Sequence, residues 1–274
     1  MEFMLDSANL EEIKQVKKLG LLDGLTTNPI IFKRGFDELK YTGNFFDYAK
    51  WILEITGDKP CFFQVAARSK ESIIHHARVL YSQLSKHGNV HIKVPIDTRE
   101  NDSQEQQEGF EAIKTLTGEK IPVLATAIVT PVQAYLAARA GAKYAVLMLR
   151  PYDDFRAEQL GIKLDKSGYL DTDFVRRKVL ARGMALDTYL CGFDTLQRTA
   201  RIFETQNLET KLIIAGIRNQ LQVSEVLATK GVDAITIPYF VFTSLFPHSK
   251  TQKFVADTYG ALPESYRQFL ENGT

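Results

Sequence analysis

Residues 121–149, IPVLATAIVTPVQAYLAARAGAKYAVLML, contain one complete strand–helix–strand unit. The apolar runs at 121–126 and 143–149 have the length and the aliphatic content of buried strands. Between them, residues 131–141 have the pattern of a helix, and Pro131 fits its first turn. Two apolar strands joined by a helix are typical of a parallel sheet covered by helices.

The same alternation extends in both directions along the chain. We predict further strands at 2–6, 22–27, 61–66, 90–95, 211–216 and 232–238, with helical segments such as 10–20, 69–88, 103–119 and 220–231 between them. Short junctions that contain glycine, such as HGNVHI and RAGAKYAV, connect helices to the next strand. Eight such units in 274 residues predict a single α/β domain, a closed (β/α)8 TIM barrel, with a doubly wound open sheet as the alternative.

The unit between the strands at 143–149 and 211–216 is about twice as long as the others. We expect an insertion at about 154–208, in which 153–170 is a loop with a turn at Ser167–Gly168. One long helix or two shorter ones should follow, and Gly183 and Gly192 are candidate breaks or close-packing points. The insertion either shapes the substrate entrance or forms an additional packing layer or a contact between subunits.

Composition excludes several classes of protein. The formal net charge of +1, from 34 basic and 33 acidic residues, argues against an electrostatic nucleic-acid binder. Cys61 and Cys191 lack metal-ligand spacing and form no disulfide framework, so we expect a cytoplasmic protein without a metal. We find no signal-peptide layout, no apolar run of about 20 residues for a membrane, and no glycine-rich dinucleotide or phosphate motif. We therefore expect no cofactor.

Polar side chains recur where the apolar strands end. They are Asp6, Thr26 to Asn28, Gln64, Lys93, Thr126, Arg150 and Arg218. In a TIM barrel these strand ends face one shared mouth, which is where active sites lie. Lys93 stands out because it interrupts the β-branched strand VHIKVP, and lysine is almost never fully buried unless it is paired.

A lysine at the rim of an interior pocket has a specific chemical use. Burial lowers the pKa of the amine, which can then attack a ketone and form a Schiff base that accepts electrons from a breaking carbon–carbon bond. Asp6 is placed to deprotonate the C4 hydroxyl of a ketose, and Gln64 and Thr126 to hold a water molecule. The alternatives are a snorkelling or salt-bridged Lys93, a helix N-cap at Asp6 and a self-bonded hydroxyl at Thr126.

Four segments together resemble the transaldolase family, including its fructose-6-phosphate aldolase branch. They are FMLDSANLEEIKQVKKLGLLDGLTTNP (3–29), VHIKVP (90–95), IPVLATAIVTPVQAYLAARAGAKYA (121–145) and KLIIAGIRNQLQVSEVLATKGVDAITIP (211–238). The resemblance covers nearly the whole chain except about 154–208. LTTNP and IKVP, in this order and on these strands, form a specific combination.

The resemblance implies a class I aldolase that transfers a dihydroxyacetone unit from a ketose to an aldehyde acceptor. Lys93 corresponds to the imine-forming lysine and Asp6 to the proton-transfer carboxylate of the family. Thr26 and Asn28 correspond to ligand contacts, and Thr126 to a water-binding threonine. The helical tail at about 249–274 corresponds to a segment that packs on a neighbouring subunit, so we expect a homo-oligomer, unless the tail simply closes the barrel.

Three positions depart from the family pattern. Gln64 replaces the glutamate usual in transaldolases, as it does in the small aldolase branch. Met148 stands where that branch has tyrosine and transaldolases have phenylalanine, so this position supplies no hydroxyl. Pro151 aligns with the arginine that binds the substrate phosphate in the family, and Arg150 lies one residue earlier.

These departures leave the donor open. We expect an anionic end group, a phosphate or a sulfonate, bound near Gly216 by Arg218 together with Arg150 or with Arg156 from the insertion. A changed anion pocket fits 6-deoxy-6-sulfofructose as donor, the substrate of a related transaldolase branch. The remaining alternatives are a simple fructose-6-phosphate aldolase, which is a lyase, and a non-catalytic sugar-binding barrel.

Overall fold

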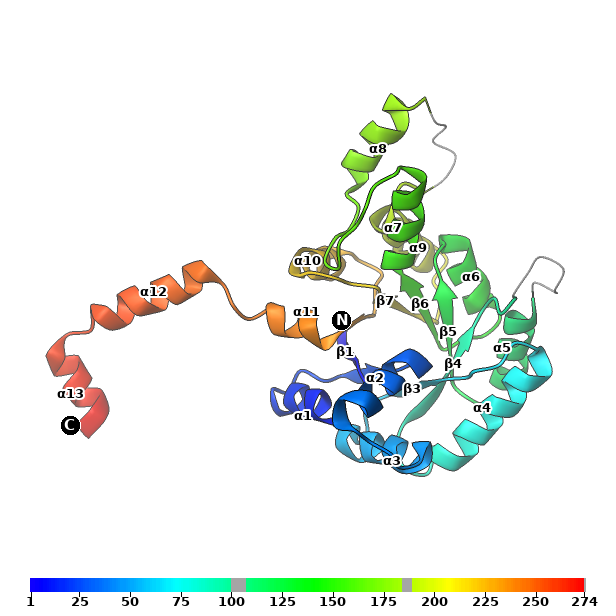
Figure 1. Cartoon of the computed structure of the whole chain (residues 1–274), viewed down its shortest axis with the longest axis horizontal. Helices are drawn as coiled ribbons and strands as arrows, with labels where there is room; N and C mark the ends of the chain where they lie inside the picture. Colours follow the sequence, from blue (N-terminus) through cyan, green and yellow to red (C-terminus); the bar gives the residue numbers. More distant parts are fainter. Residues whose placement is uncertain (100–106, 184–188, 274) are drawn as a thin grey trace.

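The strands of this protein close into one barrel, as seen in a computed structural model that describes residues 1–99, 107–183 and 189–273. Each strand pairs in parallel with the next, and β8 pairs with β1 (Figure 1). The strands are β1 (Glu2–Asp6), β2 (Gly24–Thr26), β3 (Cys61–Gln64), β4 (Val90–Pro95), β5 (Val123–Ile128), β6 (Tyr144–Met148), β7 (Lys211–Ala215) and β8 (Ala234–Ile237). The predicted (β/α)8 barrel is confirmed, and the open sheet is excluded.

Helices follow the strands in the expected alternation, and all but the last two, α12 and α13, lie around the barrel or on the segment between β6 and β7 (Figure 1). They are α1 (Leu10–Lys18), α2 (Pro29–Leu39), α3 (Phe45–Thr56), α4 (Lys70–Leu84), α5 (Glu108–Gly118), α6 (Pro131–Arg139), α7 (Leu149–Gln159), α8 (Thr172–Ala181), α9 (Gly192–Thr205), α10 (Gln220–Ala228), α11 (Tyr239–Ser244), α12 (Ser249–Gly260) and α13 (Glu264–Asn272). The helix expected at 103–119 therefore begins later, at Glu108, and residues 103–106 lie outside the described part of the chain.

Local capping explains where several helices begin. The side chain of Asn9 accepts hydrogen bonds from the backbone of Glu11 and Glu12 at the start of α1. Thr130 and Gln133 form a reciprocal capping box at the start of α6. Such caps satisfy backbone N–H groups that have no partner inside the helix, so they fix the helix start immediately after each strand.

Alternating side chains divide each strand between two environments. One set fills the barrel interior: Met4, Phe62, Leu124, Tyr144, Val146, Ile213 and Ala234. Their neighbours in sequence, such as Leu5, Phe63 and Ala125, point outward and pack with the helices in the main core. The interior is thus filled by side chains along much of its length, and the polar strand ends lie above this filling.

The segment between β6 and β7 differs from the prediction of a long loop. α7 begins directly after β6, so residues 153–159 are helical and the loop starts only after Gln159. This helix was not predicted because the positions that face inward include two charged residues, Asp153 and Arg156, which are both buried in the structure. The stretch at 172–206 forms the two helices α8 and α9, and residues 184–188 between them lie outside the described ranges.

The two buried charges of α7 bind backbone groups of the segment that follows. Asp153 accepts hydrogen bonds from the amides of Gly192 (2.7 Å) and Leu170 (3.3 Å). Arg156 donates to the carbonyls of Tyr189 (2.9 Å) and Leu190 (3.3 Å). Burying a charge is costly unless it is hydrogen-bonded, so these contacts fix where the chain enters α9.

α9 occupies a regular place in the helical ring, since it packs against α6, α7 and β7. Gly192 at its first position meets the backbone of α7, because a Cβ built there would lie 2.9 Å from the carbonyl oxygen of Leu149. Gly183 ends α8 with a φ of +63°. The helices α7, α8 and α9 therefore lie between β6 and β7, and the status of about 154–208 as an insertion stays a prediction.

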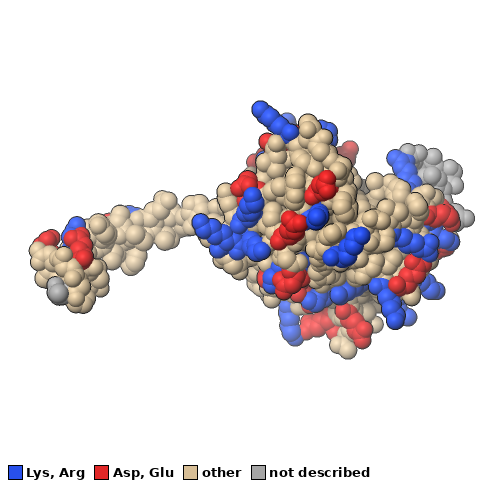
Figure 2. Space-filling model, turned by 90° about the horizontal axis from the view of Figure 1, so that it is seen from below, with Lys and Arg blue, Asp and Glu red and all other residues tan. Residues whose placement is uncertain are grey.

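The C-terminal residues leave the barrel. α11 lies against β1, whereas α12 and α13 extend away from the rest of the chain (Figure 1). Neither α12 nor α13 contains a buried residue, and large apolar side chains such as Phe254, Tyr259, Phe269 and Leu270 are exposed. In Figure 2, charged side chains are sparse along much of this arm. We refer to residues 249–273 as the C-terminal arm.

None of the helices in the described ranges has the length and apolarity that a membrane crossing requires.

Asp153 should make stability depend on pH. Burial raises the pKa of its carboxyl to about 6 in the folded chain, above the value of about 3.9 for an unfolded chain. The folded state therefore binds this proton more tightly, and the resulting stabilisation is present below about pH 4 and lost as pH rises through about 6. We expect the free energy of unfolding, measured with urea, to fall between pH 4 and 7.5. The fall in wild type should exceed that in Asp153→Asn by on the order of 2 kcal/mol.

Parallel stability profiles of wild type and Asp153→Asn would contradict this assignment. Such an equal offset at every pH would reflect only the altered hydrogen bonding of the amide.

Candidate active site

A cavity of about 310 Å³ opens at the carboxyl ends of the strands. Its walls come from the ends of β1, β2 and β4 to β8 and from the segments that follow them. The lining residues are Asp6, Thr26, Asn28, Ile30, Ile31, Arg34, Lys93, Leu124, Thr126, Val146, Met148, Lys166, Ala215, Gly216, Ile217, Arg218, Thr236, Pro238 and Phe240. The cavity lies where a TIM barrel carries its active site.

Lys93 enters this cavity from β4. Ile92 and Val94 pack outward in the main core, so the side chain of Lys93 points inward, and only 8% of the residue is exposed. Its Nζ donates a hydrogen bond to the carbonyl of Thr27 at 3.3 Å, and it forms no ion pair with any residue that the structure describes. The salt-bridged and snorkelling alternatives are therefore not what the structure shows.

Burial sets the protonation of this amine. Loss of solvation lowers the pKa of Lys93 from its ordinary value, and the negative charge of Asp6 partly opposes this effect. A desolvated amine with no ion-pair partner is the usual way in which proteins obtain a nucleophilic lysine.

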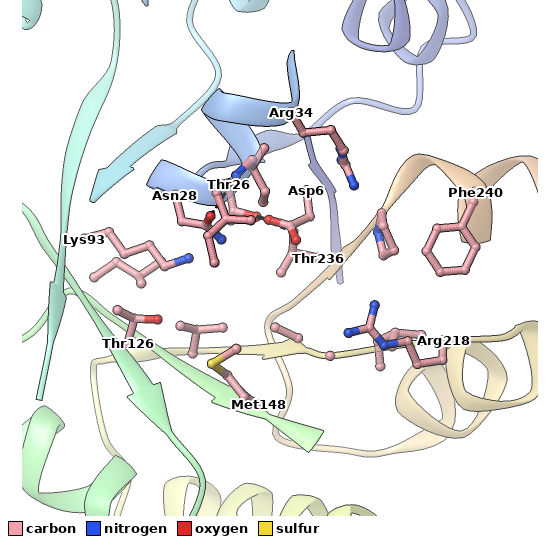
Figure 3. Close-up of a pocket in the computed structure, with 18 of the residues that line it drawn as sticks. Asp6, Thr26, Asn28, Arg34, Lys93, Thr126, Met148, Arg218, Thr236 and Phe240 are labelled. Atoms are coloured by element: carbon pink, nitrogen blue, oxygen red, sulfur yellow. Dashed lines mark hydrogen bonds between the residues drawn. The ribbon is translucent and has the colours of Figure 1, made fainter. Parts of the chain in front are cut away.

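Asp6 faces the cavity from the end of β1 and is held by two threonines (Figure 3). Thr26 donates its hydroxyl proton to Asp6 Oδ1 at 2.7 Å, and the oxygens of Thr26 and Thr236 are also 2.7 Å apart. Because the hydroxyl of Thr26 has one proton, Thr236 must donate to Thr26. The cap of α1 is Asn9, so Asp6 is not the N-cap of that helix.

Asn28 and Thr126 line the same cavity. Asn28 Oδ1 accepts from the amide of Ile31 at 2.9 Å and caps α2, so its amide group has a fixed position at the end of β2. The Thr126 hydroxyl forms no hydrogen bond with the described residues, which removes the self-bonded alternative. In Figure 3, Lys93 and Thr126 lie near each other, at the opposite side of the cavity from Arg218 and Phe240.

Two of the predicted site residues lie elsewhere. Gln64 pairs in register with Lys93, but it lines the adjoining groove formed with Asn28, Phe32 and Phe63 and is not among the residues that line the cavity. Arg150 is not among the residues that line the cavity. The structure therefore does not bring Gln64 next to Thr126 across this cavity.

Arg150 binds the loop that follows α7. Its guanidinium donates to the carbonyls of Asp165 (2.9 Å), Lys166 (3.4 Å) and Gly168 (3.1 Å) and pairs with Asp154 at 2.7 Å. Arg150 therefore supports the loop, and because it does not line the cavity it leaves direct ligand contact to other cations. Arg156, the other cation considered from the sequence, is buried beneath α9 and lines no part of the cavity.

Gly216 lies close to the start of α7. It has a φ of +76°, and a Cβ built on it would lie 2.7 Å from the amide nitrogen of Arg150. A side chain at this position would have to displace the helix backbone. Gly216 therefore allows α7 to begin directly at the end of β6, next to Met148, whose inward side chain contributes apolar surface to the cavity.

The charges along the cavity favour an anionic ligand. Its lining includes four cationic side chains, Arg34, Lys93, Lys166 and Arg218, and the single carboxylate Asp6. Arg34 and Lys166 were missed in the sequence because nothing distinguishes them there from other surface cations. Across residues 1–99, 107–183 and 189–273, no cluster of three or more His, Cys, Asp or Glu side chains could hold a metal ion.

Comparison with known proteins gives a consistent picture over the whole chain. The sequence profile described as Transaldolase/Fructose-6-phosphate aldolase matches residues 3–272. A Desulfitobacterium hafniense protein named "Probable transaldolase" is 32% identical over 262 residues, which are 94% of this chain and 98% of that protein. Proteins of the same name from Exiguobacterium sibiricum and Aquifex aeolicus are 31% and 30% identical over 262 residues, which are 94% of this chain and 97% and 96% of theirs.

The coupling between Asp6 and Lys93 can be measured without turnover. Removing the negative charge in Asp6→Asn should lower the pKa of the Lys93 amine further, because Asp6 favours the ammonium form. The pH at which Lys93 reacts half-maximally with an amine-specific reagent, followed by peptide mass spectrometry, should shift downward, while the exposed Lys163 shows no shift. If the pH of half-maximal reaction at Lys93 stays the same or rises, Asp6 does not act on this amine electrostatically.

Proposed function

We propose the following reaction from the premise that this chain belongs to the transaldolase/fructose-6-phosphate aldolase family, as the match over residues 3–272 establishes. The chain is therefore an enzyme of this class, and the resemblance found in the sequence is confirmed. We infer that it forms a Schiff base between Lys93 and a ketose with an anionic end group, cleaves the C3–C4 bond and transfers the dihydroxyacetone unit to an aldehyde.

The observation that carries this proposal is the buried Lys93 amine, which has no ion-pair partner among the described residues. Its lowered pKa leaves more of the amine unprotonated at neutral pH than in an exposed lysine. The nitrogen adds to the C2 carbonyl of the ketose, and the carbinolamine loses water to give an iminium ion. The positive nitrogen then accepts the electron pair of the bond that breaks.

Asp6 supplies the proton transfer in this proposal. Its carboxylate takes the proton of the C4 hydroxyl, the C3–C4 bond breaks, and the electron pair forms an enamine between C3 and C2 while an aldehyde leaves. The enamine then attacks the carbonyl carbon of an acceptor aldehyde, and Asp6 returns the proton to the new alkoxide. Thr26 and Thr236 support this role because their hydrogen bonds hold the carboxylate toward the cavity.

Water takes part in two steps: it leaves when the carbinolamine dehydrates, and it adds when the product iminium is hydrolysed. We assign the positioning of this water to Thr126, whose hydroxyl faces the cavity beside Lys93 (Figure 3). Met148 supplies no hydroxyl for a second contact. A catalytic contribution from Gln64 stays a prediction, since it lines the adjoining groove and not the cavity.

The ligand contacts follow from the charges and polar groups of the cavity. Thr26 and Asn28 supply polar contacts for substrate hydroxyls, and Arg218 next to Gly216 binds the anionic end group. Both fructose 6-phosphate and 6-deoxy-6-sulfofructose have such a group. Protonation of the enamine instead of attack on an acceptor would make the enzyme a lyase, so a donor panel with and without acceptor aldehyde separates these possibilities.

The non-catalytic sugar-binding barrel considered from the sequence does not fit the family assignment. It needs no nucleophile, so Lys93 would serve only as a cation. The absence of an ion-pair partner and the burial of Lys93 favour the catalytic reading, because a buried lone charge is costly to a protein that does not use it.

We also propose that the enzyme is a homo-oligomer whose C-terminal arm packs on a neighbouring subunit. The arm contains no buried residue and exposes Phe254, Tyr259, Phe269 and Leu270, side chains that a solvated helix does not need. Apolar faces of this kind are typical of segments that are covered by another chain.

Lys93 should be the site of covalent trapping. Borohydride in the presence of fructose 6-phosphate should add the reduced dihydroxyacetone unit or the whole ketose to Lys93, as read by intact and peptide mass. Lys93→Ala should abolish trapping and lower turnover by on the order of 10³-fold or more, because every step passes through the imine. Lys143→Ala, which changes an exposed lysine outside the cavity, serves as the matched control.

Circular dichroism and thermal unfolding must show that Lys93→Ala folds. Wild-type protein that is trapped by none of the ketoses in the panel, or a folded Lys93→Ala enzyme with normal turnover, would refute the Schiff-base mechanism.

Removal of the C-terminal arm tests the oligomer. Wild type should sediment as an oligomer, and a chain ending at residue 248 should sediment as a smaller species, because the apolar contacts of the arm are lost. Polar substitution of Phe254 and Tyr259 in the full-length chain should act in the same direction. A monomeric wild type, or unchanged assembly in both variants, would exclude this role for the arm.

A further inference from the structure

The end of the cavity away from Lys93 is rich in cations that the reaction itself does not use. We propose that Lys166 is a second binding cation for the anionic end group of the donor, beside Arg218, and that Arg150 is the positioning residue that holds it there. This inference rests on the proposed function, and it names the specificity-determining residue of that site.

Lys166 is a surface residue of the loop between α7 and α8, yet it lines the cavity. Its Nζ lies 4.7 Å from the centroid of the Phe240 ring, which also lines the cavity. Figure 3 shows Phe240 and Arg218 at the end of the cavity opposite Lys93. The aromatic ring holds the ammonium over the cavity without neutralising it, and no carboxylate in the described part of the chain forms an ion pair with Lys166.

The backbone around Lys166 is fixed from two sides. Arg150, at the start of α7, donates hydrogen bonds to the carbonyls of Asp165, Lys166 and Gly168. Asn219, the N-cap of α10, donates to the carbonyl of Ser167 at 2.9 Å. A loop held at four consecutive carbonyls by residues at the starts of α7 and α10 has little freedom to move the side chain of Lys166 away.

The four bound carbonyls belong to the four consecutive residues of one turn, 165–168, so every residue of this turn is held. The Asp165 carboxylate closes this turn by accepting from the amide of Ser167 at 2.9 Å and from its hydroxyl at 3.1 Å. Lys166 is the cationic side chain of this four-residue turn. The turn thus presents one ammonium group to the cavity.

Arg218 provides the first cation, and no carboxylate among the described residues forms an ion pair with it. Burial lowers the pKa of its guanidinium, and the nearby charge of Arg150 lowers it further. Arg34 faces the same end of the cavity (Figure 3), but it has a distant partner in Glu38, at 3.8 Å. An anion bound between Arg218 and Lys166 would relieve the repulsion among these cations.

The geometry also fits the chemistry of the donor. The carbonyl that reacts with Lys93 and the anionic group lie at opposite ends of a ketose such as fructose 6-phosphate. Lys93 and Arg218 likewise line opposite ends of the cavity. Pro151, in the first turn of α7, carries no charge, and the second cation comes from the loop that follows α7.

Steady-state kinetics with charged and uncharged donors test the proposal. In Lys166→Ala, kcat/KM for fructose 6-phosphate or 6-deoxy-6-sulfofructose should fall about 10- to 100-fold, mainly through KM, the loss expected for one charge-assisted contact. Borohydride trapping of dihydroxyacetone, which has no anionic group, should be unchanged. Inhibition by inorganic phosphate and by sulfate should weaken in the same variant. Lys163→Ala, an exposed lysine of the same loop outside the cavity, is the matched control and should behave as wild type.

Arg150→Met tests the positioning role. It should raise KM for the charged donor and leave trapping of dihydroxyacetone unchanged, because the loop and not the catalytic centre is loosened. Adding Lys166→Ala to Arg150→Met should cost less than the sum of the single effects, since both changes act through one ammonium group. If Arg150→Met does not fold, Lys166→Ala and the phosphate inhibition still decide the role of Lys166.

Three results would overturn the inference. They are an unchanged KM for both charged donors in Lys166→Ala, an equal loss with charged donor and dihydroxyacetone, and additive effects in the double variant. If the wild-type protein forms no imine with any ketose, both the proposed function and this inference fail. If the wild type is active and is trapped by borohydride, any one of these three results overturns the inference alone. Whether phosphate or sulfonate shows the larger effect identifies the end group.

Discussion

The desolvation of one amine governs the arrangement of this active site. Lys93 is buried in a barrel whose lower part is filled with apolar side chains, and its nearest polar contact is a backbone carbonyl. A charged ammonium is unfavourable there, so the environment shifts it toward the reactive form. A carboxylate in direct contact with the amine would remove this effect. Asp6 instead acts on Lys93 through its charge, while its carboxylate accepts a hydrogen bond from Thr26.

Much of this arrangement follows from the sequence. The alternation of apolar strands and helices predicts the barrel, because parallel strands joined by helices have few other ways to bury both faces. The rule that strand ends share one mouth then brings Asp6, Thr26, Asn28, Lys93, Thr126 and Arg218 together, and all six line the cavity. The fold and the shared cavity can be predicted because they depend on repeated local geometry, whereas the roles of these six residues stay predictions.

The failures lie where tertiary contacts override local pattern. α7 looks like a polar loop in the sequence because Asp153 and Arg156 are buried against backbone groups that only the folded chain supplies. Arg150 looks like a ligand-binding residue, yet it does not line the cavity, and its Nη1 binds carbonyls of the loop after α7. Gln64 has the inward register of a site residue, but it lines the groove beside β3. Neither spacing nor residue type contains this information.

The direct junction of β6 and α7 has a consequence for how the protein can change over time. In the proposed mechanism the barrel supplies the nucleophile and the proton-transfer group, while a turn outside the barrel supplies a cation over the far end of the cavity, so these two parts can vary separately. Substitutions in residues 160–171 can alter donor preference without disturbing a strand. Gly216 marks the limit of that freedom, since the close approach of α7 leaves no space there for any larger residue.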